Sequence, residues 1–581
     1  MSEQSYWTHA ARTRTPRRSL LRGGAAAGAA LAAAGILGCS SSNNNGASRS
    51  GSANSGSGAV PGTAGSPAAG GAAGATGAAT QASGAQPKPG GTISQRTASD
   101  PQALDLHQVS TYVALWPEAP CYNQLLQIDP QDESDGKILP DLADKWETPD
   151  NGLTYVFHLH PGIKFHDGTP FTSADIKANL DWIKTPANGK PSPRSGVLAA
   201  LQSAELPDAN TVTLHLSQPN PSLLQNLATH YFGIGPKAVL DAKGDLGDQF
   251  TGTGPFKLKT YQRGDRLELV KHPGYWISGR PYLDGMNFYI VPDDNTAFTN
   301  FLGGQYQQFS PILHENVDRV KSETGGKAQN LLVPSYTRDV VFFNTKKKPW
   351  DDMRVRQAVS LVLDRADAIS VVKGGDGEPG GYMRSSGQWG LPLDQLKQIP
   401  GYDKSNLDQA KALLQQAGVA LPLKGTLLSR TDFKDDFTWT QQALAKAGIA
   451  LDLDARDNAA AYDAAYKGQF DVIIWTVSIV LDDPDATFAE ISTGTPKAVR
   501  NWSALVDQQI DDLYAKQTVE LDNAKRKALV NQMDQRALSI FQTVQLFFHK
   551  FNNGIYNTVQ NYKYHGSLYT NKRYQDVWLS K

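Results

Sequence analysis

Between about residues 405 and 500 the chain alternates helical and strand patterns, and no other feature constrains its fold as strongly. A helix is expected to begin at Ser405–Asp408, which has the form of a capping box, and to end at Gly418. The elements expected after it are a strand near 426–429, a helix near 437–447, a strand at 449–453, a helix near 459–466 and a strand at 470–475. This alternation predicts the α/β class, with a partly parallel sheet and helices on its faces.

In sheets of this kind ligands bind beyond the carboxyl ends of the strands. Two of the expected strands end in polar residues, and these ends are our first candidates for ligand contact. They are Ser429–Arg430 and the run Trp475, Thr476, Val477 and Ser478.

Two local patterns outside this stretch are also clear. Residues 154–160 alternate between apolar and polar, as in a strand with one buried face. A helix is expected from Met353, with Asp351 or Asp352 as its N-cap.

The N-terminal residues have the pattern of an export signal. Arg17 and Arg18 precede a weakly apolar run at 23–38, which is too short and too rich in glycine for a confident membrane span. The arginine pair resembles a twin-arginine (Tat) signal, and Ile36–Cys39 resembles a bacterial lipobox. We expect Cys39 to receive a lipid anchor and to become the mature N-terminus; the alternative is a plain secretory signal with an incidental cysteine.

Composition separates a linker from a folded body. Residues 39–91 are almost wholly small or polar, so they bury too little apolar surface to order, and we expect a disordered tether. The body is mildly acidic and carries no basic stripe, which argues against a nucleic-acid partner. Cys39 and Cys121 lie in such different contexts that no disulfide is expected, and Cys121 is interpreted as a small buried residue.

Many short blocks of the body occur in a characteristic order. Three of them form one passage: Leu139–Glu147, Leu153–Pro170 and Ser173–Ile176. The others are 100–105, 252–257, 272–276, 343–346, 355–358, 363–365, 410–414 and 470–471. Together these blocks, from about residue 90 to the C-terminus, resemble the family 5 extracytoplasmic solute-binding proteins, the peptide- and nickel-type receptors of bacterial ABC importers.

The resemblance implies an α/β, two-lobed periplasmic-binding-protein fold that closes over its ligand like a flytrap, with an extra subdomain on the first lobe. Two hinge crossings are expected, near 335 and 545. We expect residues 1–38 to be the signal peptide and 39–91 the linker. Lobe I is expected to comprise 92–113, 206–335 and 545–581, with 114–205 as its extra subdomain, and lobe II to comprise 336–544.

The function implied is capture of a small ligand, most simply a peptide, and its delivery to the permease of an ABC importer that has a separate ATPase. The protein would be an exported monomer, anchored at the outer face of the membrane or in the periplasm through Cys39, with no cofactor and no catalytic activity. Two rival classes are a Tat-exported enzyme and a surface adhesin. Neither a Gly-x-Ser-x-Gly nor a His-Glu-x-x-His motif is present to support an enzyme.

The sequence constrains the identity of the ligand less than it constrains the solute-binding role. Peptide receptors that the chain resembles commonly carry an aspartate three residues after the strand tryptophan, where it pairs with the peptide ammonium. Ser478 occupies this position here, which argues against a simple free-amine dipeptide. Asp482 or Asp483 could take over the role, or both could be solvated turn carboxylates before Pro484. A sugar, an opine-like compound or a nickel complex remain alternatives.

Further candidates follow from chemistry alone. Arg430 could hold a ligand carboxylate, or it could pair with Asp432 or Asp435. Aromatic surface suits peptide side chains and sugars alike. The aromatic candidates are Tyr112, Trp116 and Trp389, and for each of them ordinary packing is at least as good an explanation as ligand contact.

A metal site is not expected. Among the histidines, His158 and His160 share one strand face and His166 follows nearby, but no carboxylate or cysteine completes a recognisable ligand spacing.

Overall fold

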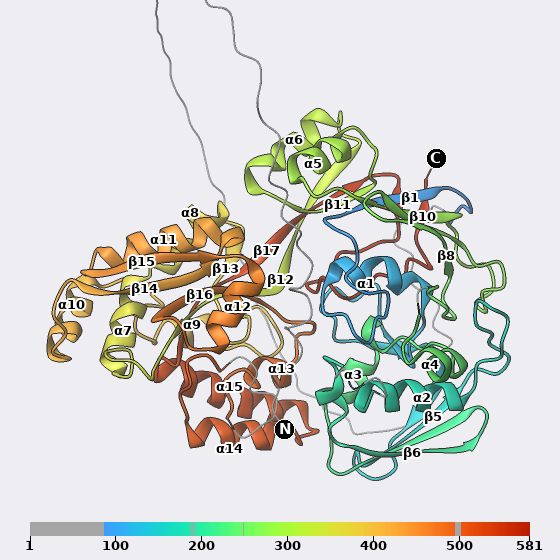
Figure 1. Ribbon diagram of the computed structural model, residues 1–581, viewed down its shortest axis with the longest axis horizontal. Coiled ribbons are helices and arrows are strands. Elements are labelled where there is room, and N and C mark those ends of the chain that lie inside the picture. The colour runs from blue at the N-terminus through green and yellow to red at the C-terminus, as the bar shows by residue number, and fades with distance from the viewer. Residues whose placement is uncertain (1–85, 187–188, 190–191, 248, 494–500, 581) are drawn as a thin grey trace, which may run out of the picture. The chain divides into compact units, whose positions relative to one another are not determined.

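A computed structural model describes residues 86–580 except 187–188, 190–191, 248 and 494–500 (Figure 1). The predicted export signal, Cys39 and most of the predicted linker lie outside the described residues. The described chain contains two groups of elements, here called lobe I and lobe II, and two long strands pass between them (Figure 1).

Lobe I is built on two four-stranded sheets. The first has the order β1 (Thr92–Thr97), β10 (Gly285–Ile290), β9 (Arg266–Lys271), β8 (Phe256–Gln262), and β1 is parallel to β10. The second is antiparallel, with the order β4 (Ala143–Glu147), β5 (Thr154–Leu159), β7 (Thr211–Leu216), β6 (Leu201–Asp208). The short strand pairs are β2 (Leu126–Ile128) with β3 (Ile138–Pro140) and β18 (Val559–Gln560) with β19 (Trp578–Leu579).

The helices of lobe I cover these sheets and flank the long strands. They are α1 (Tyr112–Glu118), α2 (Ser173–Lys184), α3 (Leu223–Leu227), α4 (Lys237–Lys243), α5 (Asp294–Leu302) and α6 (Val317–Glu323). The strand predicted at 154–160 is β5, and its apolar residues Tyr155, Phe157 and Leu159 are buried as alternation requires. The subdomain boundary expected at 205 falls inside β6, and the antiparallel sheet continues through β7.

Lobe II contains most of the mixed sheet that the sequence alternation predicts, and its edge strand β11 (Gln308–Ile312) packs with α5 and α6 of lobe I. The order of the sheet is β11, β17 (Thr543–Tyr556), β12 (Ala328–Phe343), β16 (Val472–Ser478), β14 (Leu423–Arg430), β15 (Ile449–Arg456), with β13 (Gly377–Glu378) on β17. Strand β14 is parallel to both β15 and β16. The prediction of a partly parallel α/β sheet is confirmed.

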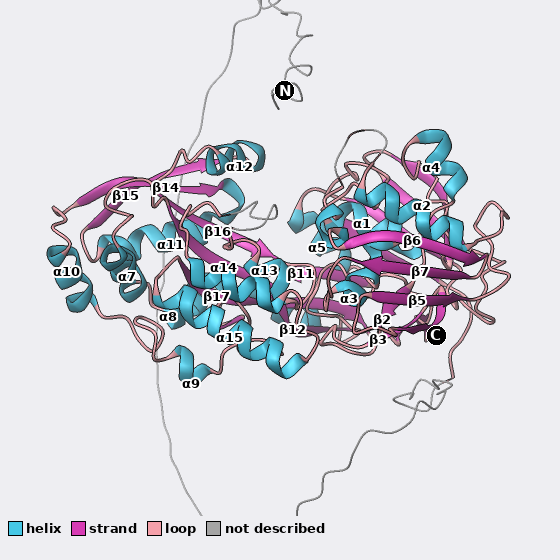
Figure 2. Cartoon of the chain, turned by 90° about the horizontal axis from the view of Figure 1, so that it is seen from below, coloured by secondary structure: helices cyan, strands magenta, loops and turns pink. Residues whose placement is uncertain are grey.

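Helices pack on both faces of this sheet (Figure 2). They are α7 (Met353–Val362), α8 (Arg365–Lys373), α9 (Leu393–Leu396), α10 (Leu407–Gln416), α11 (Lys434–Ala445), α12 (Asn458–Tyr466), α13 (Pro484–Phe488), α14 (Gln508–Gln517) and α15 (Asn523–Ser539). Successive residues of β16 serve opposite faces: Ile474 packs with α7, α10 and α11, whereas Trp475 packs with α12.

Two predicted helix caps have different outcomes. Asp352 caps α7 as expected, because its carboxylate accepts a hydrogen bond from the Arg354 N–H at 2.8 Å. The cap predicted at Ser405 is wrong by one residue. Asn406 caps α10, since the Ser405 hydroxyl is already donated to Asp364 at 3.0 Å.

Strands β12 and β17 form the hinge connection between the lobes. They pair antiparallel over most of their length, and their register shifts between Pro334 and Arg338, opposite Phe548–Lys550. This interruption lies close to the crossings predicted from the family resemblance. A pair of strands with a local break in its ladder is a suitable place for the backbone rotation that lobe closure requires.

The block Gly252–Lys257 packs directly onto the segment after α1. The Gly254 N–H donates to the Cys121 carbonyl at 3.0 Å, and Cys121 itself is fully buried, as predicted. A Cβ at Gly254 would lie 2.5 Å from the Tyr122 nitrogen and 2.6 Å from the Pro120 oxygen. Only glycine therefore allows these two backbones to approach.

We expect Gly254→Ala to lower the free energy of unfolding by about 2 kcal/mol or more, because the backbones of lobe I must separate. Urea denaturation followed by tryptophan fluorescence measures this. Gly303→Ala is the matched control, since its Cβ would meet its nearest atom, the Thr299 oxygen, at an ordinary 3.5 Å. Equal stability of the two variants would contradict the packing argument.

Candidate functional site

The carboxyl ends of parallel strands in both lobes form the candidate site. In lobe II these are the ends of β14 and β16, at Arg430 and Ser478. In lobe I they are the ends of β1 and β10, which precede α1 and α5. In Figure 2, β16, α12, α1 and α5 all lie on the same side of the hinge strands.

The four residues predicted at the end of β16 alternate between the buried and the accessible face of the sheet. Trp475 and Val477 are each 1% exposed and belong to the core under α12, whereas Thr476 is half-buried and Ser478 is exposed. Trp475 packs against Tyr462 and Trp502, with ring centroids 4.8 and 5.1 Å away. Of this run, Thr476 and Ser478 are the side chains placed to reach a ligand.

Thr476 and Ser478 are both tied to the hinge strand β12. The Ser478 hydroxyl lies 3.0 Å from the Thr337 hydroxyl, and the Thr476 hydroxyl donates to Asp339 at 2.5 Å. Ordering of these hydroxyls is therefore coupled to the position of β12 at its register shift.

Asp339 is the centre of a buried charged cluster. His549 lies 3.0 Å from its carboxylate, and Lys373 bridges it to Asp436, with nitrogen–oxygen distances of 3.8 and 3.1 Å. Burial acts to raise the pKa of Asp339, but His549 and Lys373 hold it below its usual range. Burial and the neighbouring Asp339 charge raise the pKa of Asp436 well above its usual range. Of the two carboxyls, Asp339 is therefore the stronger acid and Asp436 the one that takes up a proton more readily.

Arg430 lies at the predicted strand end, over two aromatic rings. Its guanidinium carbon is 4.5 Å from the Phe433 ring centroid and 5.7 Å from that of Trp475. This stacking orients the side chain at the end of β14. The side chain of Asp432, one of the predicted alternative partners, lies outside what the structure describes.

Asp483 is neither solvated nor exposed at the candidate site. Both of its oxygens accept hydrogen bonds from Arg526 of α15 at 3.0 Å. Ser222 of lobe I donates to the same carboxylate at 2.9 Å, and Arg526 donates to the Ser222 hydroxyl at 2.9 Å. The carboxylate therefore joins the two lobes, which corrects the expectation of a solvated turn.

Asp482 is buried as well. Burial raises its pKa to about 6, against the attraction of Arg384 and a hydrogen bond from the Gln388 backbone, while the charges of Asp483 and Asp135 add to the rise. Its burial follows from Leu481, which packs into the core of lobe I. The Ser567 hydroxyl of lobe I also donates to the Val480 carbonyl at 2.6 Å. Residues 480–483, here called the bridging segment, thus connect β16 to lobe I.

The three aromatic candidates do not lie together. Trp389 is buried in lobe II, where its indole N–H donates to the Asp482 carbonyl at 2.8 Å and Arg526 lies 4.9 Å from its ring. Tyr112 and Trp116 are both on α1 in lobe I, with ring centroids 5.0 Å apart. Trp389 therefore supports the bridging segment. Trp116 is buried in lobe I, where its indole N–H donates to the Leu568 carbonyl at 2.7 Å, and Tyr112 beside it is half-buried.

The histidines singled out in the sequence have separate structural partners. His158 lies 3.3 Å from Glu147, and His160 lies 3.8 Å from Asp144. His166 is within hydrogen-bond distance of the Phe250 and Gly254 carbonyls, and burial lowers its pKa to about 4. Within the described ranges, no three histidine, cysteine or acidic side chains form a metal-binding group.

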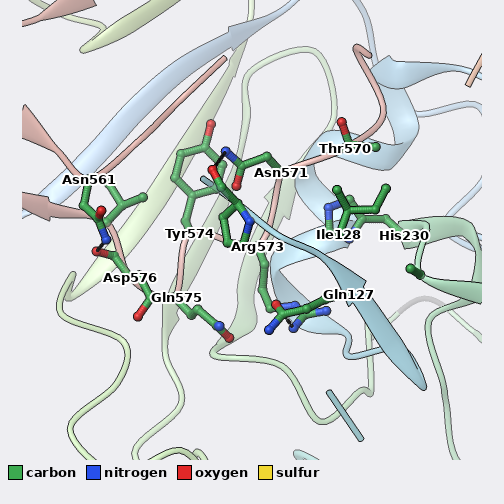
Figure 3. Close-up of a pocket in the computed structure, with 13 residues that line it drawn as sticks. Gln127, Ile128, His230, Asn561, Thr570, Asn571, Arg573, Tyr574, Gln575 and Asp576 are labelled. Carbon is green, nitrogen blue, oxygen red and sulfur yellow. Dashed lines mark hydrogen bonds between the residues drawn. The ribbon is translucent and has the colours of Figure 1, made fainter. Parts of the chain in front are cut away.

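A polar cavity inside lobe I is separate from the strand ends. It lies between β2 and residues 570–577, where Arg573 is turned toward Gln127 (Figure 3). Arg573 donates to Gln127 at 3.1 Å and binds Asp141 through both terminal nitrogens, at 2.8 and 2.6 Å. This buried ion pair holds the C-terminal segment to lobe I.

Several residues of the site carry no recognisable signal in the sequence. Arg526 and Ser222 act through partners far away in the chain, and no spacing rule connects them. Arg526 follows Asp522, the N-cap of α15, and this cap places it on the inner side of the helix. Only the tertiary arrangement reveals its role.

Comparison with known proteins decides the family. The chain matches the family described as bacterial extracellular solute-binding proteins, family 5, over residues 137–498, more than half of its length. It belongs to this family. The resemblance inferred from the ordered blocks is confirmed.

Curated relatives and solved structures agree with this assignment. The glutathione-binding protein GsiB of Escherichia coli O1:K1 is 29% identical over 407 residues, which cover 67% of this chain and 76% of GsiB. AgaA of A. tumefaciens R10, solved with agropinic acid, is 27% identical with a TM-score of 0.72, covering 84% of this chain and 99% of AgaA. DppA of Helicobacter pylori, solved with the peptide STSA, is 21% identical with a TM-score of 0.72. The match covers 85% of this chain and 99% of DppA.

The two-lobed fold and the solute-binding role follow from these findings. Members of the family are extracytoplasmic solute-binding proteins that work with ABC importer permeases. Within the part of the chain that the structure describes, no helix is long and apolar enough to cross a membrane.

We expect the burial of Asp482 to make stability depend on pH. The folded state holds a proton on Asp482 up to about pH 6, whereas the unfolded chain loses it near pH 4, so stability should fall as pH rises between these values. Asp482→Asn removes this slope. The free energy of unfolding of the variant should equal that of the wild type at pH 4. It should exceed the wild-type value by at most about 3 kcal/mol at pH 7.

Urea denaturation of both proteins from pH 4 to pH 7.5 measures this difference. Asp403→Asn, at an exposed loop position, is the matched control and should show no such trend. A pH-independent difference between Asp482→Asn and the wild type would contradict the buried placement of Asp482.

Proposed function

We propose that this protein captures a small peptide-like solute bearing at least one carboxylate between its two lobes and delivers it to an ABC importer permease. The observation that carries the ligand class is the chemistry of the strand ends. Arg430 supplies a cation at the end of β14, and Ser478 supplies a hydroxyl at the end of β16. A cation beside hydroxyls suits a carboxylate better than an ammonium.

The ligands named for the relatives support this class. Glutathione is a peptide with free carboxylates, and agropinic acid is a carboxylic acid derived from an amino acid. Both relatives exceed 25% identity with this chain. A peptide-like acid is the main proposal, and a non-peptide opine-like acid is the second candidate, which the AgaA complex favours.

Closure supplies the mechanism of capture. A ligand that contacts both lobes binds the closed form preferentially and shifts the population toward it. The contacts of Asp483 with Ser222 and of Val480 with Ser567 also connect the lobes. They add to the contacts that a bound solute makes with both lobes, and the permease recognises the closed surface.

We also propose that the chain is exported, monomeric and anchored by a lipid on Cys39. The leader with Arg17 and Arg18, the lipobox pattern and the small-residue composition of 39–91 support this. A coil of about 50 residues spans roughly 40 Å, which keeps the receptor near its permease and raises the local concentration.

The ligand proposal is tested with purified protein, using glutathione, agropinic acid and the small molecules that co-purify in native mass spectrometry. We expect an acid to bind and the protein to become more compact in small-angle X-ray scattering. Arg430→Met should weaken binding by about 10- to 100-fold, because one charge-assisted hydrogen-bonding group is lost.

Arg456→Met is the matched control for this variant. Arg456 ends the neighbouring strand β15 and pairs with Asp454 at 2.8 Å, so its loss should leave affinity unchanged. A protein that neither binds a small solute nor becomes compact would contradict the proposal, and a bound neutral sugar or metal would contradict the ligand class.

For the anchor, we expect Cys39→Ser to release the protein from the membrane fraction and to abolish incorporation of a radiolabelled fatty acid. A single lipidated cysteine with two or more acyl chains accounts for stable attachment. Cys121→Ala, which changes the other cysteine, should remain in the membrane fraction. Retention of Cys39→Ser with the membranes would contradict lipidation at this residue.

A further inference from the structure

A small cavity in lobe I combines positive charge with hydrogen-bond donors. It lies between the end of β1, α1, β11 and the C-terminal segment. Its lining residues are Gln95, Arg96, Trp116, Gln308, Phe309, Ser310, Tyr562, Tyr564, Lys572 and Tyr574. Two of them are cations and none is an acid.

Lys572 is the unusual member of this group. It is only 6% exposed, and its ammonium donates to the Tyr562 hydroxyl at 3.0 Å and lies 4.7 Å from the Trp116 ring centroid. Among the residues that the structure describes, no carboxylate lies within ion-pair distance of it. Aromatic faces offset only part of the cost of burying a charge, so this ammonium lacks an anionic partner.

The other cation of the cavity differs in this respect. Arg96 pairs with Asp294 at 2.6 Å and donates to the Val291 carbonyl at 2.8 Å. Its charge is therefore already balanced within lobe I, and Lys572 alone carries an unbalanced charge into the cavity.

Two amide groups in the lining also lack partners. The Gln308 side-chain oxygen accepts from the Tyr574 hydroxyl at 2.9 Å, but its NH₂ group has no acceptor. The NH₂ group of Gln95 has none either. Both residues are more than nine-tenths buried, where unsatisfied donors are rare and costly.

The position of the cavity connects it with the candidate site. Gln95 and Arg96 are near the carboxyl end of β1, the edge at which open α/β sheets bind ligands. Trp116 comes from α1, which follows this strand end. An anion in the cavity would accept hydrogen bonds from both amides and pair with Lys572.

We propose that Lys572, Gln95 and Gln308 form an anion subsite in lobe I that binds a carboxylate group of the captured solute. This inference rests on the proposed function for the identity of the occupant. A carboxylate supplies the negative charge that Lys572 lacks and two acceptor oxygens for the two amides. Together with Arg430 it would give a carboxylate-binding group in each lobe.

Formate tests the subsite without reference to the natural solute. We expect ¹³C-formate to show saturable line broadening with wild-type protein, and the melting temperature to rise by several degrees with formate relative to chloride at equal ionic strength. Lys572→Met should weaken this binding at least 10-fold. Gln308→Leu keeps the charge but removes one donor, and should weaken binding by a smaller factor.

Lys563→Met is the matched control, because Lys563 lies in the same segment but pairs with Glu133 at 3.2 Å. It should bind formate like the wild type. Lys572→Met should melt at or above the wild-type temperature without formate, since it removes an unbalanced buried charge. A marked fall in its melting temperature, or an unchanged formate response, would overturn the proposal.

Measuring the binding of glutathione and of co-purifying acids to both proteins separates this inference from the proposed function. If wild-type protein binds glutathione or a co-purifying acid and Lys572→Met binds it equally well, the subsite is refuted while the proposed function stands. If no solute binds and no compaction occurs, the proposed function fails, and the formate titration still decides the subsite.

Discussion

The pairing of β12 with β17 is the interaction on which the rest of the structure depends. Both strands pass between the lobes, and each contributes to a hydrophobic core on either side of the crossing. Their ladder holds the lobes together, while the register shift between Pro334 and Arg338 leaves a short stretch without regular pairing. Two lobes whose main connection is a locally weakened ladder are what a receptor needs in order to close as two bodies.

The bridging segment shows how a buried carboxylate can hold the two lobes together. Burying Asp483 would be costly alone, but Arg526 and Ser222 satisfy it from two different lobes. Asp482 keeps a proton more readily than an exposed aspartate, which lowers the cost of its burial. Of the two acids that the sequence presented as ligand candidates, Asp483 is thus used for a contact between the lobes, and Asp482 is buried beside it.

The sequence predicted the architecture well because hydrophobic periodicity and turn residues act locally. The strands around Leu427 and Ile474 and the cap at Asp352 follow from patterns within a few residues. It predicted the site less well, because burial depends on what packs against a residue from elsewhere in the chain. Trp475 was a ligand candidate from its place at a strand end, but Trp502 and Tyr462 cover it. Asp483 was left open between a ligand contact and a solvated turn, but a helix that begins 40 residues later brings Arg526 to it.

The distribution of satisfied and unsatisfied charges indicates what the receptor closes on. The buried acids at the lobe junction have partners: Asp483 has Arg526, and Asp339 has His549 and Lys373. Lys572, in contrast, is buried with aromatic rings and a hydroxyl only. On the proposal that an anion occupies this cavity, an entering carboxylate would stabilise the unbalanced cation, so binding free energy would be gained where a buried charge is otherwise costly. Selectivity for acidic solutes would then follow from this charge, even where side-chain pockets are permissive.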